Sequence, residues 1–146
     1  MEDKFHIHLT LPMLNRMELV ASSVSETLAE MMAFDEERSQ EISMALIEAC
    51  INAFEHSNGD DKNIYLTFHA ENDIMKITVS DHGNGFDPAR VEQPDIKNQL
   101  KPGAKKRGWG LKVMDSMMDS VQIQSDNNGT TVTLIKKKDL FFKEGS

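Results

Sequence analysis

Apolar and polar residues alternate along residues 4–11, a pattern of period two that is typical of a strand with one buried face. Pro12 follows and ends the predicted strand, because proline has no N–H to donate to a sheet ladder. The polar positions include His6 and His8, which could ligate a metal. We interpret both as exposed strand residues, since no cysteine or carboxylate stands at a useful spacing from them. The apolar face consists of Phe5, Ile7, Leu9 and Leu11.

The spacing of apolar residues then changes to three and four, which predicts two consecutive amphipathic helices. The first covers residues 13–32. Asp35 is a suitable N-cap for the second helix, which carries Glu36 and Glu37 in its first turn and ends near Ser57. Its predicted buried stripe consists of Ile42, Leu46, Cys50 and Ala53.

Alternation returns after a turn at residues 58–61 and predicts two antiparallel hairpins that are separated by a long irregular span. The strands of the first hairpin include residues 64–68 and 75–79. The irregular span covers residues 83–108, and a loop of that length inside one domain is usually functional or disordered. After it come a short helix at 111–118, a hairpin with strands at 121–123 and 132–134, and three lysines at 136–138 that we expect to be solvated.

Composition restricts the classes of protein that these elements can form. With 146 residues and 39% apolar content, the chain is long enough for one domain with its own core. The net charge of −8 argues against non-specific nucleic-acid binding, which needs a basic surface. The single cysteine, Cys50, allows no internal disulfide, and no apolar run approaches the roughly 20 residues of a membrane helix. From the charge and the lack of an apolar span we expect no direct contact with nucleic acid or membrane. Because no signal peptide is evident, we also expect a cytoplasmic protein.

The second predicted helix carries three polar residues of different chemistry on one face. Glu48, Asn52 and His56 follow each other at intervals of four residues, so their side chains line up along the helix. Ala49 and Ala53 lie beside them and leave space next to the row. Such a row is either a solvated helix face or the wall of a polar site, and the helix alone does not decide between the two.

Two glycine motifs later in the chain favour a polar site. The first, at residues 80–86, places Asp81 at the end of a predicted strand, just before Gly83 and Gly85. Glycines let a ligand approach the main chain closely. The aspartate can accept a hydrogen bond from an exocyclic amine, although the same residues could also form an ordinary turn.

The second glycine motif, at residues 106–111, opens a predicted helix. The free N–H groups of a helix N-terminus favour an anion such as phosphate, and the basic residues before Gly108 add positive charge. The motif is not the Walker pattern, because no Gly-Lys-Ser/Thr follows. It is not the Rossmann fingerprint either, because the third glycine and a crossover to a parallel strand are missing.

The order of these motifs resembles the GHKL ATPase superfamily, and above all its small bacterial branch of anti-sigma-factor serine/threonine kinases. Four motifs carry the resemblance over nearly the whole chain: Glu-x-x-x-Asn-x-x-x-His, Asp-x-Gly-x-Gly, Arg-Gly-x-Gly-Leu and a final Gly-Thr. The resemblance implies an α+β fold, a two-layer α/β sandwich whose mixed, mainly antiparallel sheet is covered on one face by helices (the Bergerat-type ATP-binding fold). It also implies a single histidine kinase-like ATPase domain over residues 1–146, with an ATP lid at about 86–107.

The resemblance assigns roles to individual residues, with ATP and Mg²⁺ as the expected ligands. Glu48 would activate the attacking hydroxyl, Asn52 would hold Mg²⁺ against the phosphates, and Asp81 would take the adenine amino group. The other nucleotide contacts would come from Gly83 and Gly85 around the base, Arg107, Gly108, Gly110 and Leu111 at the phosphates, and Thr130 near the adenine. We expect structural roles for His56 in the helix stripe and for Trp109 in packing.

The resemblance leaves several functions open. The first is an ATP-dependent serine/threonine kinase and anti-sigma factor that phosphorylates a STAS-type anti-anti-sigma partner in a partner-switching pathway. The second is an ATP-binding sequestration module without kinase activity, or a partner-switching regulator of a non-sigma target. A histidine kinase or a gyrase-type ATPase is disfavoured, since each needs a further domain. Glu48 favours the kinase, because a pure binding module needs no carboxylate there. The implied partners are a STAS-domain antagonist, a sigma factor and a second copy of the chain in a homodimer.

Overall fold

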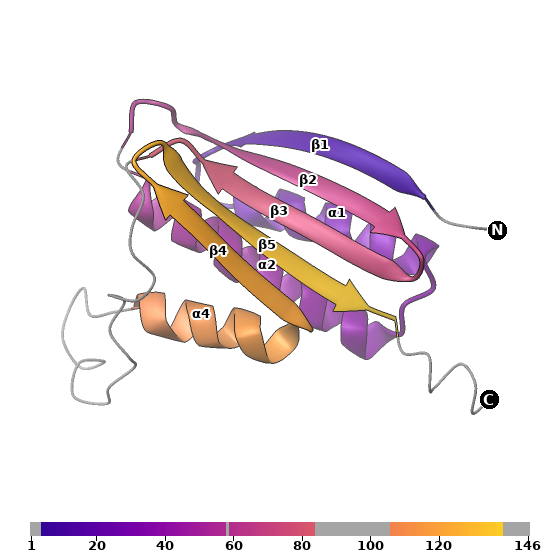
Figure 1. The fold of residues 1–146 in the computed structure, drawn as a ribbon. Coiled ribbons are helices and arrows are strands. Elements are labelled where there is room, and N and C mark those ends of the chain that lie inside the picture. The colour runs from indigo at the N-terminus through magenta and orange to yellow at the C-terminus, as the bar shows by residue number, and fades with distance from the viewer. Residues whose placement is uncertain (1–3, 58, 84–105, 139–146) are drawn as a thin grey trace.

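Within the residues that the structure describes, the chain folds into two layers, in which three helices lie against one face of a five-stranded sheet (Figure 1). The computed structural model describes residues 4–57, 59–83 and 106–138, and of residues 106–109 it describes the backbone alone. The strands are β1 (Phe5–Pro12), β2 (Asn63–Glu71), β3 (Ile74–Asp81), β4 (Ser120–Asp126) and β5 (Gly129–Lys137). The helices are α1 (Met17–Met31), α2 (Glu36–His56) and α4 (Lys106–Met117). The predicted two-layer α+β architecture is confirmed.

The sheet has the order β1-β2-β3-β5-β4, and each of its four described pairings is antiparallel. Both predicted hairpins form, β2 with β3 and β4 with β5. The two hairpins join through β3 and β5, which sets Asp81 opposite Thr130 in the register. Two of the residues predicted to meet the adenine are therefore cross-strand neighbours.

The second predicted helix forms where its sequence signals place it. Asp35 has an extended backbone before the first turn of α2, and its side chain accepts a hydrogen bond from the Arg38 N–H at 2.7 Å, as expected of an N-cap. The first helix is shorter than predicted and begins at Met17, although its apolar spacing starts at Met13. Arg16 has a φ of 81°, in the left-handed region, so the helix cannot extend to residues before it.

The core lies between the helices and the inward-facing side chains of the strands. Phe68, Ile77 and Leu134 are fully buried in the sheet, and Leu46 of α2 is fully buried in the helix layer. One prediction about this face was wrong. Lys136 was expected to be solvated, but it is 5% exposed, because the alternation along β5 places it on the inward face with Leu134. Its ammonium group donates to Glu41 Oε1 at 3.2 Å and to the carbonyl of Met117.

Candidate functional site

A cavity lies between α2 and the ends of β3 and β5 that carry Asp81 and Thr130, with α4 as a further wall. It holds about 300 Å³ of empty space, part of which is open to solvent. The lining residues are Ala49, Asn52, Ala53, His56, Val79, Asp81, Leu111, Thr130 and Val132. The structure thus brings together four residues of the predicted nucleotide site, Asn52, Asp81, Leu111 and Thr130, which are far apart in the sequence.

The polar row of α2 forms one wall of this cavity. Asn52 and His56 are buried and line it, whereas Glu48 is half-buried one turn earlier on the same helix face. Ala49 and Ala53 also line the cavity, and their small side chains leave its volume open. Of the two interpretations of this row, a solvated helix face is therefore wrong, because two of its members are enclosed.

Gly110 brings α4 against Glu48 and Asn52 of the α2 row. A methyl group placed on Gly110 would lie 3.1 Å from Glu48 Oε2 and 3.3 Å from both amide atoms of Asn52. The missing side chain therefore lets the backbone of α4 approach the Glu48 carboxylate and the Asn52 amide together. The helix begins at Lys106, so its N-terminal N–H groups lie within about one turn of this contact.

Asp81 contributes a buried carboxylate to the cavity. Its side chain is 6% exposed, and its Oδ1 accepts a hydrogen bond from the Gly83 N–H at 2.9 Å. Burial raises the pKa of Asp81, while hydrogen bonds from the backbone of Gly83 and Thr130 and the nearby His82 act in the opposite direction. Among the side chains that the structure describes, no lysine or arginine forms an ion pair with it. The cavity thus contains a strong hydrogen-bond acceptor whose charge no protein cation neutralises within this part of the chain.

Gly129 shapes the backbone around Asp81, a role that its place in the final Gly-Thr motif did not by itself indicate. Its φ is 140°, and a methyl group on it would lie 2.0 Å from the Asp81 carbonyl oxygen. Only glycine fits there, because any larger residue would collide with a neighbouring backbone. The one signal in the sequence is the position of Gly129 directly before Thr130.

His56 lines the cavity together with Asn52 and Asp81. Its expected structural role stays a prediction. Val79 and Val132 form apolar walls and were also missed. Both could have been found from the strand alternation. Val79 lies two residues before Asp81 and Val132 two residues after Thr130, so each shares a sheet face with the site residue of its own strand.

For some of the predicted site residues the structure describes only the backbone, and others lie outside the described residues. Gly83 is buried beside Asp81, whereas Gly85 and residues 86–105 of the predicted lid lie outside the described residues. Of Arg107, Gly108 and Trp109 the structure gives the helical backbone, so their contacts with phosphate or lid stay predictions.

The histidines of β1 lie away from the cavity. His6 and His8 are exposed strand residues, as predicted, and their rings are 4.6 Å apart. Across the strand pair, the ring of His69 meets His6 edge-on at 5.4 Å. Within the described residues, no group of three or more His, Cys, Asp or Glu side chains is arranged to hold a metal ion.

The chain matches the histidine kinase-like ATPase domain over residues 12–136. It belongs to this family. A serine-protein kinase RsbW of Bacillus pumilus is 31% identical over 121 residues, which cover 75% of this chain and 71% of that protein. An anti-sigma F factor of a Geobacillus species is 35% identical over 102 residues, which cover 66% of this chain and 67% of that protein. A crystal structure of the RsbU and RsbW domains of a Mycobacterium tuberculosis protein has the same fold, with a TM-score of 0.69 at 19% identity over 92% of this chain and 32% of that one.

Membership in an ATPase family implies that the chain binds ATP, and the composition of the cavity walls suits the base of this ligand. Its walls are largely apolar, and a few polar groups converge on it, which is the usual composition of a site for a planar base. The Asp81 carboxylate suits the exocyclic amine of adenine.

A magnesium ion also fits the residues of this histidine kinase-like ATPase. Magnesium keeps several waters and binds through few protein oxygens together with phosphate oxygens. The Asn52 amide provides one such oxygen, and the Glu48 carboxylate lies beside it over Gly110. Bound there, the ion would neutralise phosphate charge.

Proposed function

We propose that this chain is a serine/threonine protein kinase that uses Mg-ATP, acts as an anti-sigma factor, and phosphorylates a STAS-type anti-anti-sigma partner. The observation that carries the proposal is the convergence of Glu48 and Asn52 on Gly110, beside a cavity that contains the Asp81 carboxylate. The relatives named as serine-protein kinase and anti-sigma F factor support the same function.

The nucleotide would lie with its base against Asp81 and its phosphates towards α4. The Asp81 carboxylate would accept a hydrogen bond from the adenine amine, and Thr130 and Gly83 would flank the base. Asn52 would bind Mg²⁺ at the phosphates. The start of α4, with Arg107, Gly108, Gly110 and Leu111, would meet the phosphate oxygens, because a helix N-terminus favours anions.

Glu48 would then act as the general base of the transfer. Its carboxylate would accept the proton of the partner's serine hydroxyl while the hydroxyl oxygen bonds to the γ-phosphorus. The bond from this phosphorus to the bridging oxygen breaks, and ADP leaves with the bonding electrons. Such transfers depend on positioning and charge neutralisation more than on covalent chemistry.

An alternative function is an ATP-dependent module that sequesters its partner without phosphorylating it. The two functions require the same cavity and differ in whether Glu48 is needed. A carboxylate held next to the metal-binding amide favours the kinase, because a module that only binds would gain nothing from a negative charge near phosphates.

Transfer of radiolabel from γ-labelled ATP to a candidate STAS protein tests the proposal. We expect Glu48→Gln to bind Mg-ATP with unchanged affinity by calorimetry and to lose at least about a hundredfold in transfer rate. Glu55→Gln is the matched control, because Glu55 is an exposed glutamate of the same helix. Undiminished transfer by Glu48→Gln would refute the catalytic role, and a wild-type chain that binds ATP but transfers nothing would favour the sequestration module.

The partners form a further part of the proposal. We expect a homodimer and, as ligands of the dimer, a STAS-domain antagonist and a sigma factor. Several large apolar side chains in α1, in α2 and just before α1 are exposed, which supports an interface: Leu14, Leu19, Val20, Met31 and Met44. No helix within the described residues is long and apolar enough to cross a membrane, and we propose a cytoplasmic location. Light scattering measures the dimer directly, and a monomer at all concentrations would exclude it.

A further inference from the structure

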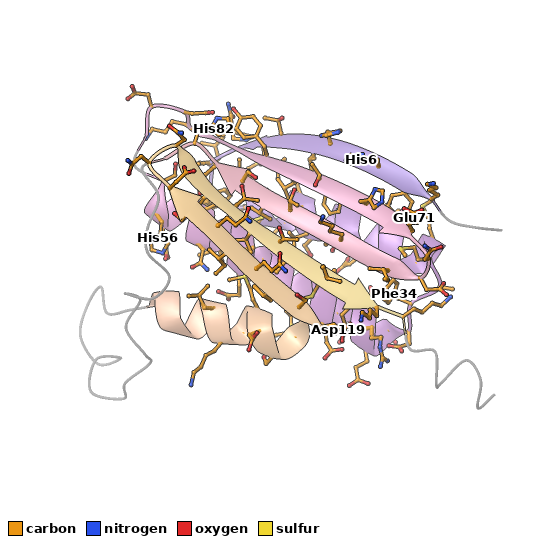
Figure 2. All side chains as sticks on the ribbon, viewed as in Figure 1. His6, Phe34, His56, Glu71, His82 and Asp119 are labelled. Carbon is orange, nitrogen blue, oxygen red and sulfur yellow. The ribbon has the colours of Figure 1, made fainter. Side chains whose placement is uncertain are left out.

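Three polar side chains form a cluster on the sheet face that the helices leave open, next to the end of β3. Asp61 lies in the connection between α2 and β2, Tyr65 in β2, and His82 directly after β3. Asp61 Oδ2 accepts a hydrogen bond from the Tyr65 hydroxyl at 2.5 Å and lies 2.9 Å from His82 Nδ1. The Tyr65 and His82 rings are stacked, with centroids 4.6 Å apart. We call these three residues the His82 cluster; Figure 2 labels His82 at this end of the sheet.

The His82 cluster contacts the segment that presents Asp81 to the cavity. Successive residues point to opposite faces of a strand, so Asp81 faces the helices whereas His82 faces the open side. His82 is the link between Asp81 and Gly83, whose N–H donates to the Asp81 carboxylate at 2.9 Å. A side chain that fixes His82 from outside therefore also fixes the orientation of Asp81 inside.

A second contact supports the same segment from the α2 side. A methyl group on Gly59 would lie 2.7 Å from the His82 carbonyl oxygen and 3.2 Å from Gly83 Cα. The backbone after α2 therefore packs directly on this turn, and Asp61 follows two residues later. Through these contacts, the end of the helix that carries Asn52 and His56 is connected to the strand end that carries Asp81.

Asp61 has the properties of a fixed anchor. The hydrogen bond from the Tyr65 hydroxyl lowers the pKa of Asp61 most, and those from the Asn63 N–H and His82 lower it further. The same bond to Asp61 raises the pKa of Tyr65, so the hydroxyl keeps its proton. The carboxylate thus stays ionised and the phenol stays a donor over the ordinary pH range, which keeps the cluster in one arrangement.

We propose that Asp61, Tyr65 and His82 are positioning residues that set the specificity of the site for adenine by holding the turn from Asp81 to Gly83. This inference rests on the proposed role of Asp81 at the base. The three side chains lie on the opposite sheet face and act through the backbone of His82. A guanine base presents a carbonyl oxygen where adenine presents its amine, so a firmly placed carboxylate rejects guanine by charge repulsion. A loosely placed one rejects it less.

The sheet offers a matched control at its other end. His69 Nε2 lies 3.3 Å from Glu71 Oε2, so the same pair of side-chain types meets on the same sheet face, far from the cavity. Figure 2 labels Glu71 and His6 at this end and His82 at the other. Replacement of His69 removes a histidine–carboxylate contact without touching the turn at Asp81.

The experiment compares the binding of ATP, GTP and inorganic tripolyphosphate, with Mg²⁺, to the full chain by calorimetry. We expect His82→Ala and Asp61→Asn to weaken ATP binding about tenfold, as a loss of about 1.4 kcal/mol does. The preference for ATP over GTP should fall by a similar factor, and tripolyphosphate affinity should not change. Tyr65→Phe keeps the ring stacking and should lose less. His69→Ala should bind all three like the wild type, and circular dichroism checks that each variant is folded.

Two results would overturn the positioning role, and a third would refute the proposed function. ATP and GTP affinities of His82→Ala equal to those of the wild type would overturn the positioning role. An equal loss for tripolyphosphate would also overturn it, since the effect would then not concern the base. A wild-type chain without affinity for ATP would instead refute the proposed function, whatever the variants do.

Discussion

Two buried charged side chains, Lys136 and Asp81, face the helices from opposite ends of the sheet, and they differ in their bonding partners. Lys136 of β5 is enclosed by its partners, since its ammonium group donates to Glu41 of α2 and to the carbonyl of Met117 at the end of α4. Asp81 of β3 receives backbone N–H groups, and no lysine or arginine side chain that the structure describes pairs with it.

The Lys136 charge therefore has a structural role, whereas the Asp81 carboxylate is available to a ligand. A buried charge is costly unless it is paired, so a paired one is explained by the fold itself. The Lys136 ammonium also lies at the C-terminus of α4, where a cation is favourable, and thereby ties this helix to α2 and β5. The Asp81 carboxylate lines a cavity instead. We propose that the group it accepts a hydrogen bond from there is the adenine amine.

The largest expected loss of stability comes from the backbone that supports Asp81. Gly129→Ala should lower the free energy of unfolding by about 4 kcal/mol, because it adds left-handed strain and a collision with the Asp81 carbonyl. Urea denaturation measures this loss. Asn128→Ala, an exposed change in the same turn, should stay within about 0.5 kcal/mol. If Gly129→Ala is as stable as the wild type, the close contact between Gly129 and the Asp81 carbonyl does not stabilise this end of β3.

The next largest effect concerns the paired charge. Lys136→Ala should lower the free energy of unfolding by about 3 kcal/mol, because it leaves Glu41 and the Met117 carbonyl without their donor. Lys137→Ala is the control, since Lys137 is exposed and should contribute less than about 0.5 kcal/mol. Equal urea midpoints for the two variants would remove the contrast between Lys136 and Asp81.

Asp81→Asn should behave in the opposite way, with a loss of binding and no loss of stability. Burial raises the pKa of Asp81, so the folded state disfavours its ionised form, and stability falls as pH rises from the ordinary value of 3.8 through the raised one. The amide lacks this penalty, so the variant should be at least as stable at pH 7, with the difference vanishing below about pH 4. ATP affinity should fall about a hundredfold. A variant that is less stable at pH 7 would show that this carboxylate has a structural role.

The smallest effect on stability is expected at Gly110. In Gly110→Ala the gain in helix propensity, about 1 kcal/mol, opposes the crowding of Glu48 and Asn52, so the free energy of unfolding should change little. The phosphoryl-transfer rate should nevertheless fall more than about tenfold, because both proposed catalytic groups must shift. Lys112→Ala, also in α4, is a control for the helix. An unchanged rate in Gly110→Ala would mean that the contact with Glu48 and Asn52 is not part of the catalytic geometry.

The features of this structure that depend on residues close together in the sequence could be predicted from the sequence. The N-cap at Asp35, the two hairpins and the polar row of α2 follow from short-range patterns, and the family motifs located Asn52 and Asp81 in one site. The burial of Lys136 was missed because three consecutive lysines look solvated, although the alternation along β5 turns the first of them inwards.

Contacts between distant segments could not be predicted. Gly110 meets Glu48 and Asn52 because of how α4 packs on α2, and no local pattern encodes that packing. Asp61 and His82 likewise meet only after β2 and β3 pair. The start of α1 was also missed, because Arg16 has a left-handed backbone that ends the helix on that side. Apolar spacing indicates which face of a helix is buried, but it does not indicate the backbone angles at the helix end.

A crystal structure with Mg²⁺ and a non-hydrolysable ATP analogue would locate the nucleotide relative to Glu48, Asn52 and Asp81. We expect the adenine amine within hydrogen-bond distance of the Asp81 carboxylate, the metal on the Asn52 amide oxygen, and the γ-phosphate between Glu48 and the start of α4. A nucleotide bound elsewhere, or one whose base lies away from Asp81, would contradict this expectation.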